Sequence, residues 1–122
     1  MPWELDSDRP IYAQIVDRLK HEIVSGFYPP GSRLPSVRDL AAQASVNPST
    51  MQKAFTELER TGLIVTRRTS GRTVTEDTAL IEQVRSELAE LQISQFLTRM
   101  QHLGYQKDDS IRLLLAKKEE NS

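Results

Sequence analysis

The chain has 122 residues, of which 38% are hydrophobic and 27% charged, and its formal net charge is −1. This length suits one compact domain with a short appendage, and the composition is ordinary for a soluble globular protein. The absence of cysteine excludes disulfides, thiolate metal sites and a cysteine nucleophile. The acidic N-terminus lacks the apolar run of a signal peptide, and no apolar stretch could span a bilayer. We therefore expect a soluble, cytoplasmic protein with no membrane partner.

The first half of the chain predicts three helices. Between Pro10 and Gly26, apolar residues recur every four positions, which is typical of an amphipathic helix. The next nine residues contain three prolines and a glycine and are expected to form a loop. Ser36 then predicts the N-cap of a short helix over residues 37–44, and Asn47 the N-cap of a third helix that ends at Gly62. A short helix, a turn and a second helix are the sequence form of a helix-turn-helix.

The second half predicts a hairpin and two more helices. The β-branched pieces "LIVT" and "RTVT" flank "RRTSG", which indicates a β-hairpin. A helical period follows up to Gly104, and then a short helix capped by Asp108 or Asp109. The predicted fold class is mainly α with a small β-hairpin (α+β), a winged helix-turn-helix with a C-terminal helical extension. We place the domain boundary between residues 1–75 and 76–122, where the charge changes sign.

The charge is unevenly distributed along the chain. Residues 33–75 hold seven Arg or Lys against three acids, a net of +4, whereas residues 1–32 carry −2 and residues 76–122 carry −3. A basic segment between two acidic ones is consistent with a nucleic-acid partner, although such a segment is often only a solvated face.

The third predicted helix is the candidate DNA-recognition helix. A major groove about 12 Å wide accepts one helix, whose N-terminal residues approach the base edges. Gln52 could pair with adenine, whereas Lys53 better suits a phosphate. Ser36 and the free amides of its helix favour an anion, with Arg38 one turn inside. The candidate contacts in the two helices are Ser36, Arg38, Asn47, Ser49, Thr50, Gln52 and Lys53. In the alternative interpretation, these residues do not contact DNA: Ser36 and Asn47 only cap helices, and Gln52 and Lys53 are solvated.

The hairpin is the candidate wing. Its arginines, Arg67, Arg68 and Arg72, suit phosphates or a narrow minor groove, and the only acids expected nearby, Glu76 and Asp77, lie beyond the second strand. A charged hairpin that merely avoids edge pairing is the alternative.

The segment from "RPIYAQI" to "ERTGLI" is similar to the DNA-binding domain of the GntR family of bacterial transcription regulators. The pieces "PIYxQI", "SGxYxPGxxLPSxRxLA" and "LxxxGLI" occur in the family's order and spacing, and "LGY" after one long helix resembles the small YtrA-type subfamily. The resemblance implies DNA contacts by Arg38, Ser49, Gln52 and the wing tip at Ser70 and Gly71. Many members have Gly at Thr69 and Thr-Phe at Arg72-Thr73. Arg72 is therefore either an added phosphate contact or a solvated strand residue.

The 47 residues after Thr75 are too few for an enclosed effector pocket, and the effector, if there is one, is unknown. They carry an apolar stripe that needs a partner: Leu80, Val84, Leu88, Leu91, Phe96, Met100 and Leu103. Part of it could fold back on the first helix, but we favour a homodimer, as the YtrA-type resemblance implies. A dimer matches an inverted-repeat operator with half-sites about 34 Å apart.

No catalytic constellation is present in the sequence. His21 and His102 have no neighbour at ligand spacing, so we expect no metal, no cofactor and no enzyme. The function expected is a sequence-specific DNA-binding regulator, and a repressor because no activation surface is evident. The alternative is a winged-helix interaction module whose basic face meets an acidic protein.

Overall fold

The structure is a computed structural model that describes residues 3–69 and 71–118. The chain divides into two compact units, Met1–Arg85 and Ser86–Ser122. The first unit holds α1 (Ile11–Val24), α2 (Val37–Ala44), α3 (Pro48–Thr61), β1 (Ile64–Arg67), β2 (Gly71–Val74) and the start of α4 (Thr78–His102). The second holds the rest of α4 and α5 (Lys107–Ala116). This element order confirms the predicted fold class, a winged helix-turn-helix with a helical extension.

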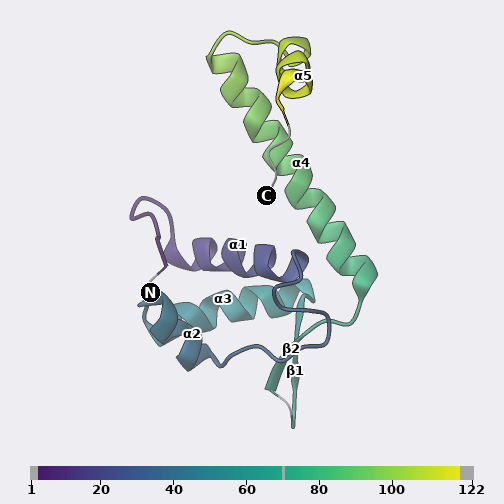
Figure 1. The fold of residues 1–122 in the computed structure, drawn as a ribbon. Helices are drawn as coiled ribbons and strands as arrows, with labels where there is room; N and C mark the ends of the chain where they lie inside the picture. Colours follow the sequence, from purple (N-terminus) through teal and green to yellow (C-terminus); the bar gives the residue numbers. More distant parts are fainter. Residues whose placement is uncertain (1–2, 70, 119–122) are drawn as a thin grey trace. The chain divides into compact units, whose positions relative to one another are not determined.

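Helix α3 is the centre of the first unit, because it packs against α1, α2 and β1 (Figure 1). The apolar stripe predicted for this helix is buried: Met51, Ala54, Phe55 and Leu58 are almost inaccessible to solvent. The side chains of Ile15 and Leu19 from α1 and Leu40 from α2 complete the core. The opposite side of α3 is therefore free to face a partner.

The helix boundaries follow from local capping. The Ser36 hydroxyl accepts from the Asp39 amide at 3.0 Å, and Asn47 Oδ1 accepts from the Ser49 amide at 2.9 Å. Pro48 occupies the first turn of α3, where its missing N–H costs nothing. The helix ends at Gly62, whose φ of +86° is a conformation that favours glycine.

The segment before α2 was predicted as loop, but it adds a short backbone-paired stretch to the hairpin. Arg33 forms a bridge with Thr73, Leu34 N donates to Arg72 O at 2.9 Å, and Val74 N donates to Ser32 O at 2.9 Å. The prolines that suggest an open loop flank these residues and leave their N–H groups available. Strand β2 is thus paired on both edges, with β1 on one side and with residues 32–34 on the other.

The long helix differs from its predicted stripe at its beginning. The buried residue is Ile81, at 4% exposure, while Leu80 is half-buried beside Gly62. This first turn of α4 belongs to the core of the first unit, which extends to Arg85 rather than ending at the predicted boundary after residue 75. Leu80 of the stripe thus packs within the chain, but against the end of α3. The alternative of a fold-back on the first helix stays a prediction.

The cap of the last helix is also displaced from its prediction. Gln106 occupies the N-cap of α5, and the Asp109 carboxylate accepts from the Gln106 amide at 2.9 Å. Asp109 therefore supports the cap from inside the first turn instead of forming it, and Asp108 is a first-turn residue. The prediction of a short helix here is confirmed, but the capping residue is Gln106 rather than Asp108 or Asp109.

Candidate nucleic-acid interface

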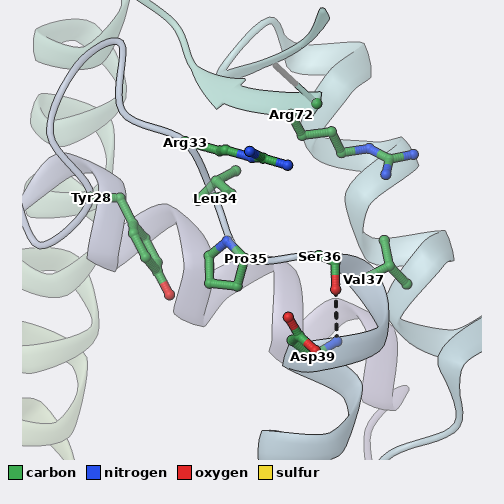
Figure 2. A pocket seen from close by; sticks show the side chains of 9 residues that line it. Tyr28, Arg33, Leu34, Pro35, Ser36, Val37, Asp39 and Arg72 are labelled. Carbon is green, nitrogen blue, oxygen red and sulfur yellow. Dashed lines mark hydrogen bonds between the residues drawn. The ribbon is translucent and has the colours of Figure 1, made fainter. Parts of the chain in front are cut away.

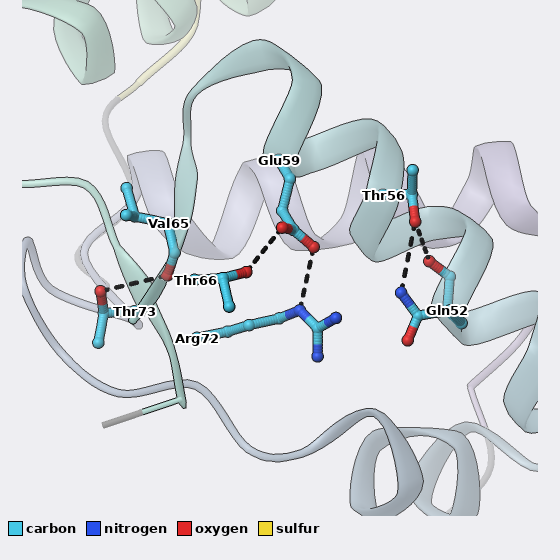
Figure 3. Close-up of polar contacts among 7 residues, drawn as sticks. All are labelled: Gln52, Thr56, Glu59, Val65, Thr66, Arg72 and Thr73. Carbon is cyan, nitrogen blue, oxygen red and sulfur yellow. Dashed lines mark hydrogen bonds and ion pairs between the residues drawn. The ribbon is translucent and has the colours of Figure 1, made fainter. Parts of the chain in front are cut away.

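The exposed side of α3 presents an ordered polar face. Gln52 Nε2 donates to the Thr56 hydroxyl at 3.3 Å, and that hydroxyl donates to the Gln52 carbonyl at 3.0 Å (Figure 3). Near the start of the helix, the Ser49 hydroxyl donates to Asn47 Oδ1 at 2.8 Å. These contacts orient the side chains along the helix while leaving acceptor groups of Gln52 and Ser49 for a partner.

Two predicted contacts lie on another side of α3. The Lys53 ammonium lies 4.0 Å from the centroid of the Tyr12 ring of α1, a cation–π geometry. Thr50 lines an open hollow together with Trp3, Ile11 and Val46. Ser49 and Gln52 are three residues apart and therefore share the polar side of α3, whereas Thr50 and Lys53 lie toward α1. A role of these two residues in DNA binding stays a prediction.

The wing projects exposed arginines from the end of β1. Arg67 closes the strand and Arg68 follows in the turn, and both side chains are exposed. Within residues 3–69 and 71–118, neither arginine forms an ion pair. The predicted contact Ser70 lies outside the described residues, and Gly71 begins β2 with a φ of +73°. The tip of the hairpin thus offers two positive charges to a polyanion.

Arg72 does not fit the second of its two predicted roles, that of a solvated strand residue. Its Nε donates to Glu59 Oε1 of α3 at 3.0 Å (Figure 3). Its guanidinium lies 5.3 Å from the centroid of the Phe55 ring. The Arg72 side chain is only 27% exposed, so it is not a freely solvated strand residue, and a phosphate contact through its terminal nitrogens stays a prediction. The prediction that only Glu76 and Asp77 are near the wing is wrong, because the end of α3 brings Glu59 against the hairpin.

The pKa of the Glu59 carboxyl is lowered from its ordinary value. The largest cause is the hydrogen bond from the Thr66 hydroxyl, at 2.6 Å, and the hydrogen bond and charge of Arg72 add to it, while partial burial acts in the opposite direction. The anionic form that bonds both strands of the hairpin is thus the favoured one.

We predict that this contact survives mild acidification. Because the folded-state pKa of Glu59 lies below the unfolded-state value, its stabilising contribution is complete above the unfolded pKa and is lost as pH falls through the folded pKa. A titration of the Glu59 carboxyl carbon by NMR should show a midpoint below that of an ordinary glutamate. In an Arg72→Leu variant the midpoint should rise, and an unchanged midpoint would contradict the contact.

A cleft separates the hairpin from the start of α2 (Figure 2). It has a volume of about 530 Å³ and is lined by the Ser36 and Val37 end of α2, by Arg33 and by Arg72. The Arg33 guanidinium lies against Gly71, with Nε and Nη2 each 3.7 Å from the position a Cβ there would take. Sequence reasoning missed Arg33 as a site residue, because its place beside the wing depends on the backbone pairing with Thr73.

The N-terminal end of α2 is a third part of the candidate interface, and it could bind an anion. Ser36 caps the helix, and Arg38 in the first turn is exposed. The first amides of a helix attract negative charge, and an adjacent arginine adds to that attraction. Ser36 is the N-cap that the sequence predicted, and Arg38 lies in the first turn rather than one turn inside. Contacts of these residues with DNA stay a prediction.

A helix-turn-helix with a polar exposed helix, flanked by an arginine-bearing hairpin, defines the class of winged-helix DNA-binding proteins. Residues 11–74 match the sequence profile of the bacterial regulatory proteins, gntR family. The chain belongs to this GntR family of transcriptional regulators, which confirms the resemblance found in the sequence.

The similarity to known regulators extends over most of the chain. It is 39% identical over 100 residues to the HTH-type transcriptional repressor YtrA of Bacillus subtilis, covering 80% of this chain and 76% of YtrA. A solved GntR family transcriptional regulator from Listeria monocytogenes is 40% identical with a TM-score of 0.84, covering 93% of this chain and all of the other. The AraR DNA-binding domain in complex with operator ORX1 is 26% identical with a TM-score of 0.52, covering 62% of this chain and 92% of that domain's chain.

Other kinds of site are not evident in the described part of the chain. Residues 3–69 and 71–118 contain no group of three or more His, Asp or Glu side chains that could hold a metal ion. None of the described helices has the length and apolar character needed to cross a membrane.

Proposed function

We propose that the protein is a homodimeric transcriptional repressor that binds an inverted-repeat operator through α3 and the wing. The observation that carries the DNA-binding part of this proposal is that Glu59 joins the polar side of α3 to the arginine-bearing hairpin, so that the two surfaces lie next to each other. Gln52, Thr56 and Glu59 are spaced by four and three residues, so they share one side of α3, and Glu59 bonds the wing from that side. A helix lying in the major groove would place the wing arginines beside it on the DNA backbone or minor groove.

The neighbouring proteins support the proposal without testing it for this chain. YtrA of Bacillus subtilis is named a repressor, and the AraR domain is seen with an operator. The YtrA match covers 80% of this chain, so it reaches into the helical extension, which favours the same mode of action here. Because bacterial operators lie in the cytoplasm, the proposal places the protein there. Repression by binding to an operator needs no catalysis, so the proposal assigns no enzymatic activity.

The dimer is proposed from the apolar surface of the second unit. Along the predicted stripe, Leu91 and Leu103 are more than half exposed, while Leu88, Phe96 and Met100 are half-buried. Further apolar side chains that the stripe did not include are also exposed: Ile93, Tyr105, Ile111, Leu113, Leu114 and Leu115. Ile93, Phe96 and Leu114 line a hollow between α4 and α5. An apolar surface of this kind marks an interaction site, and a second copy presents the same surface in return.

The DNA-binding proposal is tested by selecting duplexes from a random 30-base-pair library with the purified chain and measuring their affinity at several salt concentrations. We expect an inverted repeat to be recovered, hereafter the selected duplex, and the affinity to fall steeply with salt because each phosphate contact releases counterions. Recovery of no sequence, or binding that does not depend on salt, would contradict the proposal. In that case, binding of the basic face to an acidic protein becomes the explanation to pursue.

A further inference from the structure

Glu59 connects the recognition helix to both strands of the wing (Figure 3). Its Oε1 accepts from Arg72 Nε of β2 at 3.0 Å, and its Oε2 accepts from the Thr66 hydroxyl of β1 at 2.6 Å. Thr66 and Arg72 are direct partners in the hairpin register. One carboxylate is therefore bonded to opposite residues of both strands, and it restrains the hairpin with respect to α3.

The position of this carboxylate needs an explanation if α3 binds DNA. Glu59 lies two turns beyond Gln52 on the same side of the helix, so its charge lies toward the side that the proposed function turns to DNA. A free carboxylate there would repel phosphates. Arg72 neutralises it, and the half-buried pair is further held by the Phe55 ring.

Arg72 keeps unused donors in this arrangement. Only its Nε is bonded to Glu59, and the two terminal nitrogens point away from the carboxylate (Figure 3). Among the described residues they have no hydrogen-bond partner. Arg72 also lines the cleft to which Ser36 and Arg33 contribute (Figure 2). A guanidinium fixed at Nε presents its other donors in a defined direction, which suits a phosphate oxygen.

We propose that Glu59 is a positioning residue for DNA recognition. Through Thr66 and Arg72 it sets the orientation of the wing relative to Gln52, and it aims the terminal nitrogens of Arg72 at the DNA backbone. Ordering the wing before binding lowers the entropy lost in the complex. This inference rests on the proposed DNA-binding function, and it assigns a favourable role to an acidic residue on a surface that meets a polyanion.

A Glu59→Gln substitution separates this role from a simple effect of charge. If Glu59 were only a repelling charge, its removal would strengthen binding to every duplex. If Glu59 positions the wing, glutamine weakens binding to the selected duplex, because its neutral amide holds the Arg72 guanidinium only by an uncharged hydrogen bond and would meet Thr66 with an N–H in place of the acceptor oxygen. The matched control is Glu57→Gln, which removes the same charge from the same helix at a residue paired with Arg60.

The experiment measures the affinities of the unaltered chain and both variants for the selected duplex and for an unrelated duplex of equal length. The ratio of the two affinities should fall about tenfold in Glu59→Gln, as expected for lost hydrogen bonds to a charged group. It should stay within about twofold in Glu57→Gln, whose partner is exposed. A ratio that does not fall in Glu59→Gln, or tighter binding of both duplexes, would overturn the inference.

A second set of variants tests the coupling to Arg72. Arg72→Ala leaves Glu59 unpaired beside the DNA, so Arg72→Ala combined with Glu59→Gln should bind the selected duplex more tightly than Arg72→Ala alone. Strictly additive losses would overturn the inference. If Glu59→Gln does not fold, Thr66→Val removes one of the two donors from an exposed position and should lower the ratio by a smaller factor.

The two proposals can fail separately in this design. If the unaltered chain shows no preference for the selected duplex, the DNA-binding function fails and the inference fails with it. If the unaltered chain prefers that duplex and the Glu59→Gln ratio is unchanged, the positioning role alone is wrong.

Discussion

Replacing Leu114 and Leu115 of α5 by glutamate is expected to convert the protein to a monomer and to weaken its binding to the selected duplex about 100-fold or more. The physical reason is that two joined recognition helices bind an inverted repeat with a high effective concentration, which a monomer loses. Both leucines are exposed, Leu115 by 81%, so the substitutions should not disturb the core of the first unit. Sedimentation velocity gives the oligomeric state, and a titration of labelled duplex gives the affinity.

The control for this prediction adds the same charge elsewhere on the helical extension. Gln83→Glu combined with Ser86→Glu changes two exposed polar positions of α4 and should leave both the mass and the affinity unchanged. A Leu114→Glu, Leu115→Glu variant that sediments as a dimer would show that α5 does not hold the two copies together. A variant that is monomeric but binds the repeat with full affinity would show that dimerisation is not needed for recognition.

The elements that could be predicted are those whose signals are local in the sequence. Ser36 and Asn47 cap the helices that follow them by accepting from an amide three or two residues later, and Gly62 ends α3 because its φ is positive. The stripe of α3 needs only the helical period, so its burial could also be predicted. Such features give the helix-turn-helix before any long-range contact is known.

The features that could not be predicted depend on contacts between distant residues. Glu59 and Arg72 are 13 residues apart, and they meet because the hairpin register places Arg72 opposite Thr66 at the end of α3. Lys53 lies over Tyr12 because α1 crosses that side of α3, which no spacing within α3 reveals. The sequence therefore predicts which residue types line the interface but not which of them are already paired.

The same distinction divides the three wing arginines into two groups. Arg72 is half-buried and bonded to Glu59, whereas Arg67 and Arg68 are exposed at the hairpin tip. A variant that removes all three would combine the loss of a positioned side chain with the loss of two free charges. The free charges are better tested alone, because their effect on DNA binding is electrostatic and should be independent of sequence.

An Arg67→Ala, Arg68→Ala variant is therefore expected to weaken binding to the selected and the unrelated duplex by a similar factor, about tenfold or more at physiological salt. Its affinity should also depend less steeply on salt, since each lost phosphate contact lowers the slope by about 0.9 and a dimer loses up to four. The measurement is the affinity for both duplexes over a range of salt concentrations.

The control for the wing variant is Arg60→Ala combined with Arg85→Ala. It removes the same charge from exposed arginines that are each paired with a glutamate one turn before them, and it should leave the salt dependence unchanged. Equal slopes in the wing variant and the unaltered chain would show that the tip does not meet phosphates. A loss confined to duplexes with A·T-rich flanks would instead indicate that the arginines enter a narrow minor groove, where they read its negative potential.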